Sequence, residues 1–155
     1  MPSRPLTVVF CLPGSSFSGK FVQCWSNLLA WCMNNEIKPI VSQQQSCNIY
    51  YVRNMCLGGD VLRGPAQKPF DGKLDYDYIM WIDSDILFAA QQFQRLLANR
   101  ADIVAGLYLM EGGMQFNEEA GSTIGILMFS AMRAAGKAAS GKERPSHSIR
   151  NVKTS

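Results

Sequence analysis

The feature that most constrains the fold is an apolar run, Tyr78–Ile82, that leads straight into two carboxylates, Asp83 and Asp85. Apolar residues resume at once with Ile86. An uninterrupted apolar run of this length is typical of a strand buried on both faces in the middle of a parallel sheet. Burying a carboxylate is costly unless it is paired or bound to a metal. Because hard divalent cations take oxygen ligands, the pair predicts a metal site at the end of this strand.

Short apolar runs and amphipathic stretches alternate along the rest of the chain. Ser18 is a suitable N-cap for a helix that begins at Gly19. Pro39 indicates an edge strand, because proline has no N–H to donate to a neighbouring strand. Residues 58–76 are rich in Gly and Pro and are expected to form a long loop. The expected strands are 6–12, 37–41, 78–82 and 101–110, and the expected helices are 19–34, 48–56 and 89–99.

This order of elements predicts an α/β fold, a Rossmann-like domain with a mostly parallel sheet and helices on both faces. We expect one domain over residues 1–155. In the helix 48–56, Ile49, Val52 and Cys56 fall roughly on one side. Residues 124–132 fit either a strand or a helix.

Composition places the chain among globular proteins. Its 155 residues are 47% hydrophobic and 17% charged, which excludes a disordered chain. No apolar run approaches the length that a membrane span needs, and the N-terminus lacks a signal-peptide pattern. The five cysteines contain no CxxC pair, which argues against a disulfide framework and a zinc ribbon. We therefore expect a cytoplasmic protein.

The net charge of +3 is unevenly distributed. Residues 131–155 hold six Lys and Arg against a single acid, Glu143. A basic tail of this kind can contact nucleic acid or an anionic membrane surface. No aromatic residue lies among these charges to stack on a base, so we interpret the tail as solvated and expect no nucleic-acid partner.

The first interpretation of the carboxylates is a nucleotide-sugar site. A D-x-D pair at a strand end can hold Mn²⁺ or Mg²⁺ against a diphosphate, whose growing charge the metal neutralises. Arg53 is the candidate basic residue, because a guanidinium binds phosphate bidentately. In open α/β sheets ligands bind outside the carboxyl ends of the strands. If the first strand and the Asp83 strand are neighbours, the Pro13-Gly14 turn and the carboxylates line one crevice.

The second interpretation is a P-loop nucleotide-binding protein. Gly14–Lys20 matches the spacing G-x-x-x-x-G-K and follows a buried strand. A P-loop needs Ser or Thr after the lysine to bind Mg²⁺, but Phe21 occupies that position.

The third interpretation is structural. A D-x-D sequence is common by chance, and acidic pairs often lie in solvated turns. The apolar residues on both sides of Asp83 and Asp85 argue against a solvated turn here.

The chain resembles the nucleotide-binding part of the GT-A glycosyltransferases, particularly virus-type and small bacterial members with an Asp-Ser-Asp motif. The resemblance covers residues 6–110. It is carried by the first strand ending in Cys11–Gly14, the segment Tyr51–Asn54, the run Asp75–Asp85, the helix after it, and the segment Ala101–Gly106. It implies a GT-A domain that transfers sugar from a UDP- or GDP-linked donor with Mn²⁺ or Mg²⁺, and it is compatible with a virus- or phage-encoded protein.

The resemblance also implies roles for individual residues. Arg53 would approach the diphosphate or the donor sugar. Asp83 would lie near the ribose and the metal, Asp85 would be the firmest metal ligand, and Ser84 between them would belong to the nucleotide-sugar site. The residues that would border the nucleoside are Leu12, Pro13, Gly14 and Ser15.

Residues 111–155 do not match the acceptor half of that family. Glu111, Glu118 and Glu119 are the acidic residues before the tail, and none is assigned as a catalytic base. His147 is interpreted as an exposed residue rather than a late metal ligand. The acceptor is left open among a glycan, a protein and a small molecule. A non-catalytic nucleotide-sugar-binding remnant is therefore a further alternative.

Overall fold

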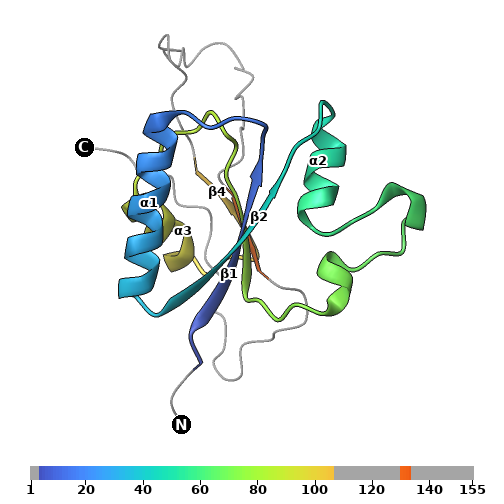
Figure 1. The fold of residues 1–155 in the computed structure, drawn as a ribbon. Helices are drawn as coiled ribbons and strands as arrows, with labels where there is room; N and C mark the ends of the chain where they lie inside the picture. The colour runs from blue at the N-terminus through green and yellow to red at the C-terminus, as the bar shows by residue number, and fades with distance from the viewer. Residues whose placement is uncertain (1–3, 107–129, 134–155) are drawn as a thin grey trace, which may run out of the picture.

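The computed structural model describes residues 4–106 and 130–133. They form an α/β fold in which a sheet carries helices on both faces (Figure 1). The fold class predicted from the sequence is confirmed. Each layer follows from the alternation of buried strands and amphipathic helices.

The sheet of the described residues has the strand order β2-β1-β3-β5-β4. β1 pairs in parallel with β2 on one side and β3 on the other, and β5 runs antiparallel to both β3 and β4. The three parallel strands form the part of the sheet that carries the candidate site. The strands are β1 (Leu6–Pro13), β2 (Ile37–Gln44), β3 (Tyr78–Trp81), β4 (Ile103–Ala105) and β5 (Ser130–Arg133).

Two details differ from the expected strands. β4 covers only Ile103–Ala105 of the expected strand 101–110, of which residues 107–110 lie outside the described part of the chain. The antiparallel β5 separates β4 from β3. The sequence left residues 124–132 open between strand and helix, and β5 forms at Ser130–Arg133. Such a short strand is stabilised by its two neighbours, which lie far away in the sequence.

Two helices cover one face of the sheet. In α1 (Gly19–Asn34) the hydroxyl of Ser18 accepts the Phe21 N–H at 3.1 Å, as the predicted N-cap requires. α3 (Ala90–Ala98) lies beside it, on the left in Figure 1. Phe10 of β1 lies between them, with its ring centroid 5.3 Å from those of Trp25 and Phe93. The side chains buried in this layer include Val8, Phe10, Leu12, Phe21, Leu28, Cys32, Met80, Ile82, Phe93 and Leu96.

The other face is covered by α2 (Ile49–Cys56), whose N-cap is Asn48. Val52 and Cys56 are buried. Ile49, which the sequence places roughly on the same side of the helix, is 48% exposed. The reason is its place in the first turn of the helix. Residues 45–51 are all exposed, and burial begins one turn later, at Val52.

The expected loop 58–76 is an ordered part of this second layer. It contains 3₁₀ turns at Val61–Arg63 and Pro69–Gly72. The Phe70 N–H donates to the Leu57 carbonyl at 2.7 Å, which closes the segment at its base. Phe70, Leu74 and Tyr76 pack against the buried cluster that contains Val9, Cys11, Cys56, Ile79 and Trp81.

An acidic pair precedes β3, at the amino end of the strand. The Asp77 carboxylate accepts hydrogen bonds from the Thr7 N–H at 2.9 Å and from Arg4 at 2.6 Å. Asp75 lies 3.8 Å from the same arginine and is largely exposed. These contacts connect the start of β1 to the start of β3.

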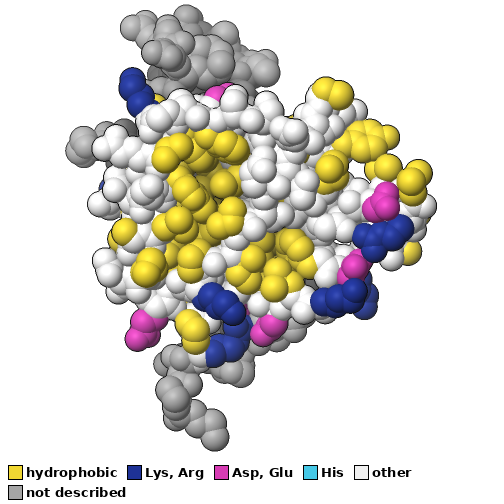
Figure 2. All heavy atoms as spheres, in the orientation of Figure 1, with side chains coloured by type: hydrophobic (Ala, Val, Ile, Leu, Met, Phe, Trp, Pro, Cys, Tyr) yellow, Lys and Arg dark blue, Asp and Glu magenta, His cyan; other side chains and the backbone are white. Residues whose placement is uncertain are grey.

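The surface carries apolar side chains over α1 and β2, near the centre of Figure 2. Val22 and Met33 of α1 and Val41 of β2 are among the exposed large hydrophobic residues. β2 is an edge strand of the sheet formed by the described residues, which confirms the prediction from Pro39. In residues 4–106 and 130–133, no helix is both long and apolar enough to cross a membrane.

Candidate functional site

The candidate site lies where β1 and β3 end. The two strands are parallel and paired, with Cys11 opposite Trp81, and the Ile82 N–H donates to the Cys11 carbonyl at 3.1 Å. Their carboxyl ends therefore lie at the same edge of the sheet. The neighbouring position of the turn after β1 and the carboxylates after β3, expected from the sequence, is confirmed.

Gly14 is in direct contact with the acidic motif. A Cβ atom at Gly14 would lie 2.7 Å from the Cβ of Ser84, and the φ of Gly14 is +156°. Both values make a side chain at this position unfavourable. The absence of a side chain thus lets the backbone after β1 touch the D-S-D turn.

Two glutamines of β2 hold this glycine from the other side. The Gly14 N–H donates to the Gln44 carbonyl at 3.0 Å, and the side-chain amide of Gln43 donates to the Gly14 carbonyl at 2.6 Å. Sequence reasoning missed Gln43. The available signal was its place at the carboxyl end of a strand parallel to β1, where its side chain could reach the neighbouring turn.

Asp83 is buried and faces α2. Side chains alternate along a strand, so Ile82 points into the layer of α1 and α3 while Trp81 and Asp83 point toward α2. The Nη2 of Arg53 lies 3.4 Å from the Oδ2 of Asp83, and these side chains are 27% and 10% exposed. The Cζ of Arg53 also lies 5.8 Å from the centroid of the Trp81 ring. A cation on α2 therefore compensates the buried carboxylate.

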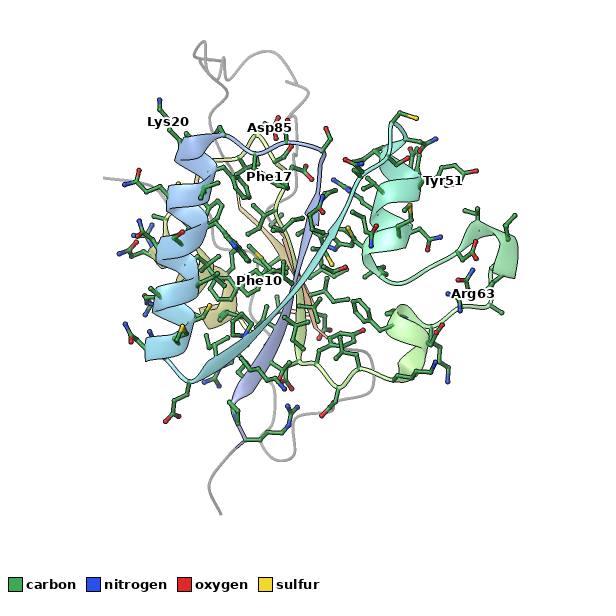
Figure 3. All side chains as sticks on the ribbon, in the orientation of Figure 1. Phe10, Phe17, Lys20, Tyr51, Arg63 and Asp85 are labelled. Atoms are coloured by element: carbon green, nitrogen blue, oxygen red, sulfur yellow. The ribbon has the colours of Figure 1, made fainter. Side chains whose placement is uncertain are left out.

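Asp85 has a different environment two residues later. The Ile86 N–H donates to the Asp83 carbonyl at 3.1 Å, which bends the chain into a turn. Ile86 and Phe88 are buried beyond the turn and anchor it, while Asp85 remains exposed. Figure 3 shows Asp85 at the end of the molecule toward which β1 points, together with Phe17 and Lys20.

The donor set fits a divalent cation that is shared with a phosphate ligand. Mg²⁺ is usually bound by one or two carboxylates together with substrate phosphates and water. Asp85 offers an accessible carboxylate, and Asp83 is a second one in the same turn. Within the described residues no group of three or more His, Cys, Asp or Glu side chains could hold a metal by itself. A Mn²⁺ or Mg²⁺ cofactor stays a prediction.

The P-loop segment Gly14–Lys20 joins β1 to α1, as that interpretation requires. A Cβ at Gly14 would be 3.5 Å from the Cζ of Phe17, and the Phe17 ring centroid is 4.8 Å from that of Phe21. The Phe17 ring therefore lies between Gly14 and Phe21. In a P-loop, the corresponding segment encloses phosphate. Phe21 is 2% exposed and belongs to the core.

The other predicted site residues lie in β1 or in the turn that follows it, and they differ in exposure. Leu12 is buried in the layer below α1 and α3, so its backbone rather than its side chain could border a ligand. Pro13 is buried at the end of β1, and Ser15 is exposed in the turn that follows. Glu111, Glu118, Glu119 and His147 lie outside the described residues.

Two buried thiols, Cys11 and Cys56, lie on the same side of the sheet as α2. The Cys11 thiol donates to the Cys56 carbonyl at 3.8 Å. A hydrogen bond with the Cys56 side chain, together with burial, raises the pKa of Cys11 far above its usual range. Cys11 is therefore a neutral, buried thiol rather than a nucleophile or metal ligand. All five cysteines of the chain are free.

No protein-family model, curated protein or solved structure matches the chain. The resemblance to GT-A glycosyltransferases stays a prediction from sequence motifs. The geometry of the site therefore carries the functional proposal.

Proposed function

We propose that this chain is a metal-dependent glycosyltransferase domain that binds a nucleotide-diphosphate sugar where β1 and β3 end. The observation that carries the proposal is the contact between Gly14 and Ser84. It brings a bare stretch of backbone against a turn with two carboxylates, at the edge of a parallel sheet where α/β proteins bind ligands.

Each residue has a role in this proposal. Asp85 supplies the accessible metal ligand, and Asp83 lies near the ribose and the metal. Arg53 approaches the diphosphate or the sugar, because its guanidinium can bind two phosphate oxygens at once. The turn Pro13–Ser15 borders the nucleoside. When bound, Mn²⁺ or Mg²⁺ supplies Lewis-acid stabilisation of the charge on a leaving diphosphate.

The donor in this proposal is a UDP- or GDP-linked sugar, and the acceptor is a glycan, a protein or a small molecule. None of the described residues is assigned to the acceptor or to catalysis. The five free cysteines favour a reducing compartment, so a cytoplasmic location is part of the proposal.

A P-loop nucleotide-binding protein is the second candidate, because Gly14–Lys20 lies between a buried strand and a helix as a P-loop does. The ring of Phe17 within that segment and the burial of Phe21 favour the transferase over this candidate. A non-catalytic module would share the donor site of the transferase and differ only in turnover.

A thermal-shift panel tests the proposal. We expect UDP or GDP and their sugar conjugates to raise the melting temperature by about 5 °C or more at saturation, and to do so only with Mn²⁺ or Mg²⁺. Calorimetry with Asp85→Ala should show that this metal-dependent binding is lost, whereas Lys20→Ala should have a mild effect.

The opposite pattern would identify the second candidate. Stabilisation by ATP or GTP that disappears in Lys20→Ala and survives in Asp85→Ala would contradict the transferase. Release of sugar from the stabilising conjugate, by transfer or by slow hydrolysis, separates an enzyme from a non-catalytic module.

A further inference from the structure

Arg53 places a positive charge inside the candidate site, next to the carboxylate of Asp83. The Nη2 of Arg53 lies 3.4 Å from the Oδ2 of Asp83. A tight charge-assisted hydrogen bond is about 2.7–2.9 Å long. The guanidinium therefore compensates the carboxylate across a contact that is longer than a tight charge-assisted hydrogen bond.

The helix below this pair is firmly held. Val52 and Cys56, on either side of Arg53 in α2, are both buried against the sheet. Any movement of the Arg53 charge therefore involves its long side chain rather than α2 itself. The face of Trp81, 5.8 Å from the guanidinium carbon, supports the side chain in its present position through a cation–π contact.

A divalent cation that binds at Asp83 without a diphosphate would lie close to the Arg53 guanidinium. Like charges at such a separation repel strongly in a partly buried site. Displacing Arg53 would instead leave its charge without the carboxylate that compensates it, which is costly in a partly buried position. Either route weakens the binding of free metal.

A diphosphate changes this balance. It offers the guanidinium two phosphate oxygens in the fork geometry that arginine prefers. The two negative charges of a nucleotide-sugar diphosphate also cancel the two positive charges of the cation. The site therefore keeps its net charge when the cation and the diphosphate bind together.

We propose that Arg53 is a specificity-determining residue that makes the site select a divalent cation complexed with a diphosphate over the free cation. In the ligand-free protein it compensates Asp83, and it turns to the diphosphate when the cation takes its place. This inference rests on the proposed function, because it assumes a diphosphate ligand at this site.

The test measures Mn²⁺ binding without nucleotide, from the loss of the electron paramagnetic resonance signal of free Mn²⁺. We expect Arg53→Gln to bind Mn²⁺ alone about tenfold more tightly than the wild-type protein, the lower range for close charge pairs. The same variant should bind UDP-sugar in the presence of Mn²⁺ more weakly. Unchanged or weaker binding of Mn²⁺ alone would overturn the inference.

Two further variants identify the cause. Arg63→Gln removes an equal charge from the exposed pair with Asp71, on the far side of α2 from Asp85 (Figure 3). It should leave Mn²⁺ binding unchanged. Arg53→Lys keeps the positive charge and should bind Mn²⁺ alone as weakly as the wild-type protein. If Arg53→Lys gains Mn²⁺ affinity as Arg53→Gln does, charge compensation is not the reason.

The wild-type protein provides a measurement that needs no variant, in case Arg53→Gln does not fold. Binding is reciprocal, so Mn²⁺ should tighten UDP-sugar binding and UDP-sugar should tighten Mn²⁺ binding by the same factor, about tenfold or more. A mutual tightening that is measurable but well below tenfold would overturn the inference alone, whereas equal affinity for Mn²⁺ with and without UDP-sugar would contradict the proposed metal-dependent binding as well. If the wild-type protein binds no UDP- or GDP-linked ligand with Mn²⁺, the proposed function itself fails.

Discussion

Strand β3 has an acidic pair at each end, and the two pairs share their spacing but not their surroundings. At the amino end, Asp77 accepts short hydrogen bonds from the Thr7 N–H and from Arg4. At the carboxyl end, the contact between Asp83 and Arg53 is longer, at 3.4 Å. Both outer carboxylates, Asp75 and Asp85, are exposed.

The difference shows that D-x-D spacing by itself does not identify a ligand site. The amino-end pair joins two strands through a backbone donor and an arginine, which is a structural use of charge. The carboxyl-end pair is next to the Gly14 turn and to a helix that carries a basic residue. Position at the end of a parallel strand, rather than spacing, favours function for the second pair.

The largest effect is expected on metal-dependent ligand binding, and it should distinguish Asp85 from Asp75. Asp85→Asn removes the accessible metal ligand and should weaken Mn²⁺-dependent binding of UDP- or GDP-sugar by about 100-fold, because even outer-shell partners of a metal are worth 10- to 100-fold. Asp75→Asn is the matched control and should leave that affinity unchanged. Titration calorimetry of the two variants gives the answer, and equal losses would remove the functional distinction between the two ends.

The inner carboxylate of the amino end should matter for stability instead. Asp77→Ala leaves the N–H of the buried Thr7 without this acceptor and breaks the hydrogen bond from Arg4, so the free energy of unfolding should fall by about 2 kcal/mol. Urea denaturation measures this loss. Metal-dependent ligand binding by the folded variant should equal that of the wild-type protein, and a selective loss of binding would assign a functional role to this end.

Gly14→Ala tests the contact that places the turn against the carboxylates. Its Cβ would lie 2.7 Å from that of Ser84, at a φ of +156°, and we expect a loss of about 1–2 kcal/mol of stability. Adding Ser84→Gly should recover the part due to the collision. As a control, Gly19→Ala places its Cβ in open space at the start of α1 and should be neutral or slightly stabilising. A stable Gly14→Ala protein with full affinity would show that the contact is dispensable.

The smallest effect is expected at Gln43. Gln43→Leu removes the side-chain hydrogen bond to the Gly14 carbonyl and should weaken metal-dependent nucleotide binding about fivefold, the value of one ordinary hydrogen bond. Gln45→Leu, also exposed and two residues later, serves as the control. Indistinguishable affinities for the two variants would mean that β2 does not position the turn.

Local sequence patterns were sufficient to predict the helices and strands whose bounds depend on nearby residues alone. The helix α1 begins and ends where the sequence predicts, because Ser18 caps it and a stripe of apolar side chains faces the sheet. The strands β1 and β3 form at the two apolar runs where the sequence predicts buried strands. Ile49 shows the limit of periodicity, since the correct helical face is exposed wherever the helix extends past its neighbours.

The site could be predicted in part. Asp83 and Asp85 could be identified because a carboxylate directly after a buried strand is costly unless it is paired or bound to a metal. The Gly14 turn could be identified because it follows the first buried strand. The contact of Arg53 with Asp83 and the reach of Gln43 to Gly14 depend on how separate elements pack, which no local pattern encodes. The antiparallel pairing of β5 with β3 and β4 was not predicted for the same reason, because it joins segments distant in sequence.

The position of Trp81 under Arg53 gives the protein an optical reporter of its own. The indole lies 5.8 Å from the guanidinium carbon, close enough for its emission to respond when that charge leaves or a paramagnetic ion arrives nearby. The chain has three tryptophans, and Trp25 and Trp31 lie on α1, across the sheet from this position. Phenylalanine at those two positions would leave Trp81 as the single tryptophan, beside the acidic turn. Its fluorescence would then report occupancy of the site.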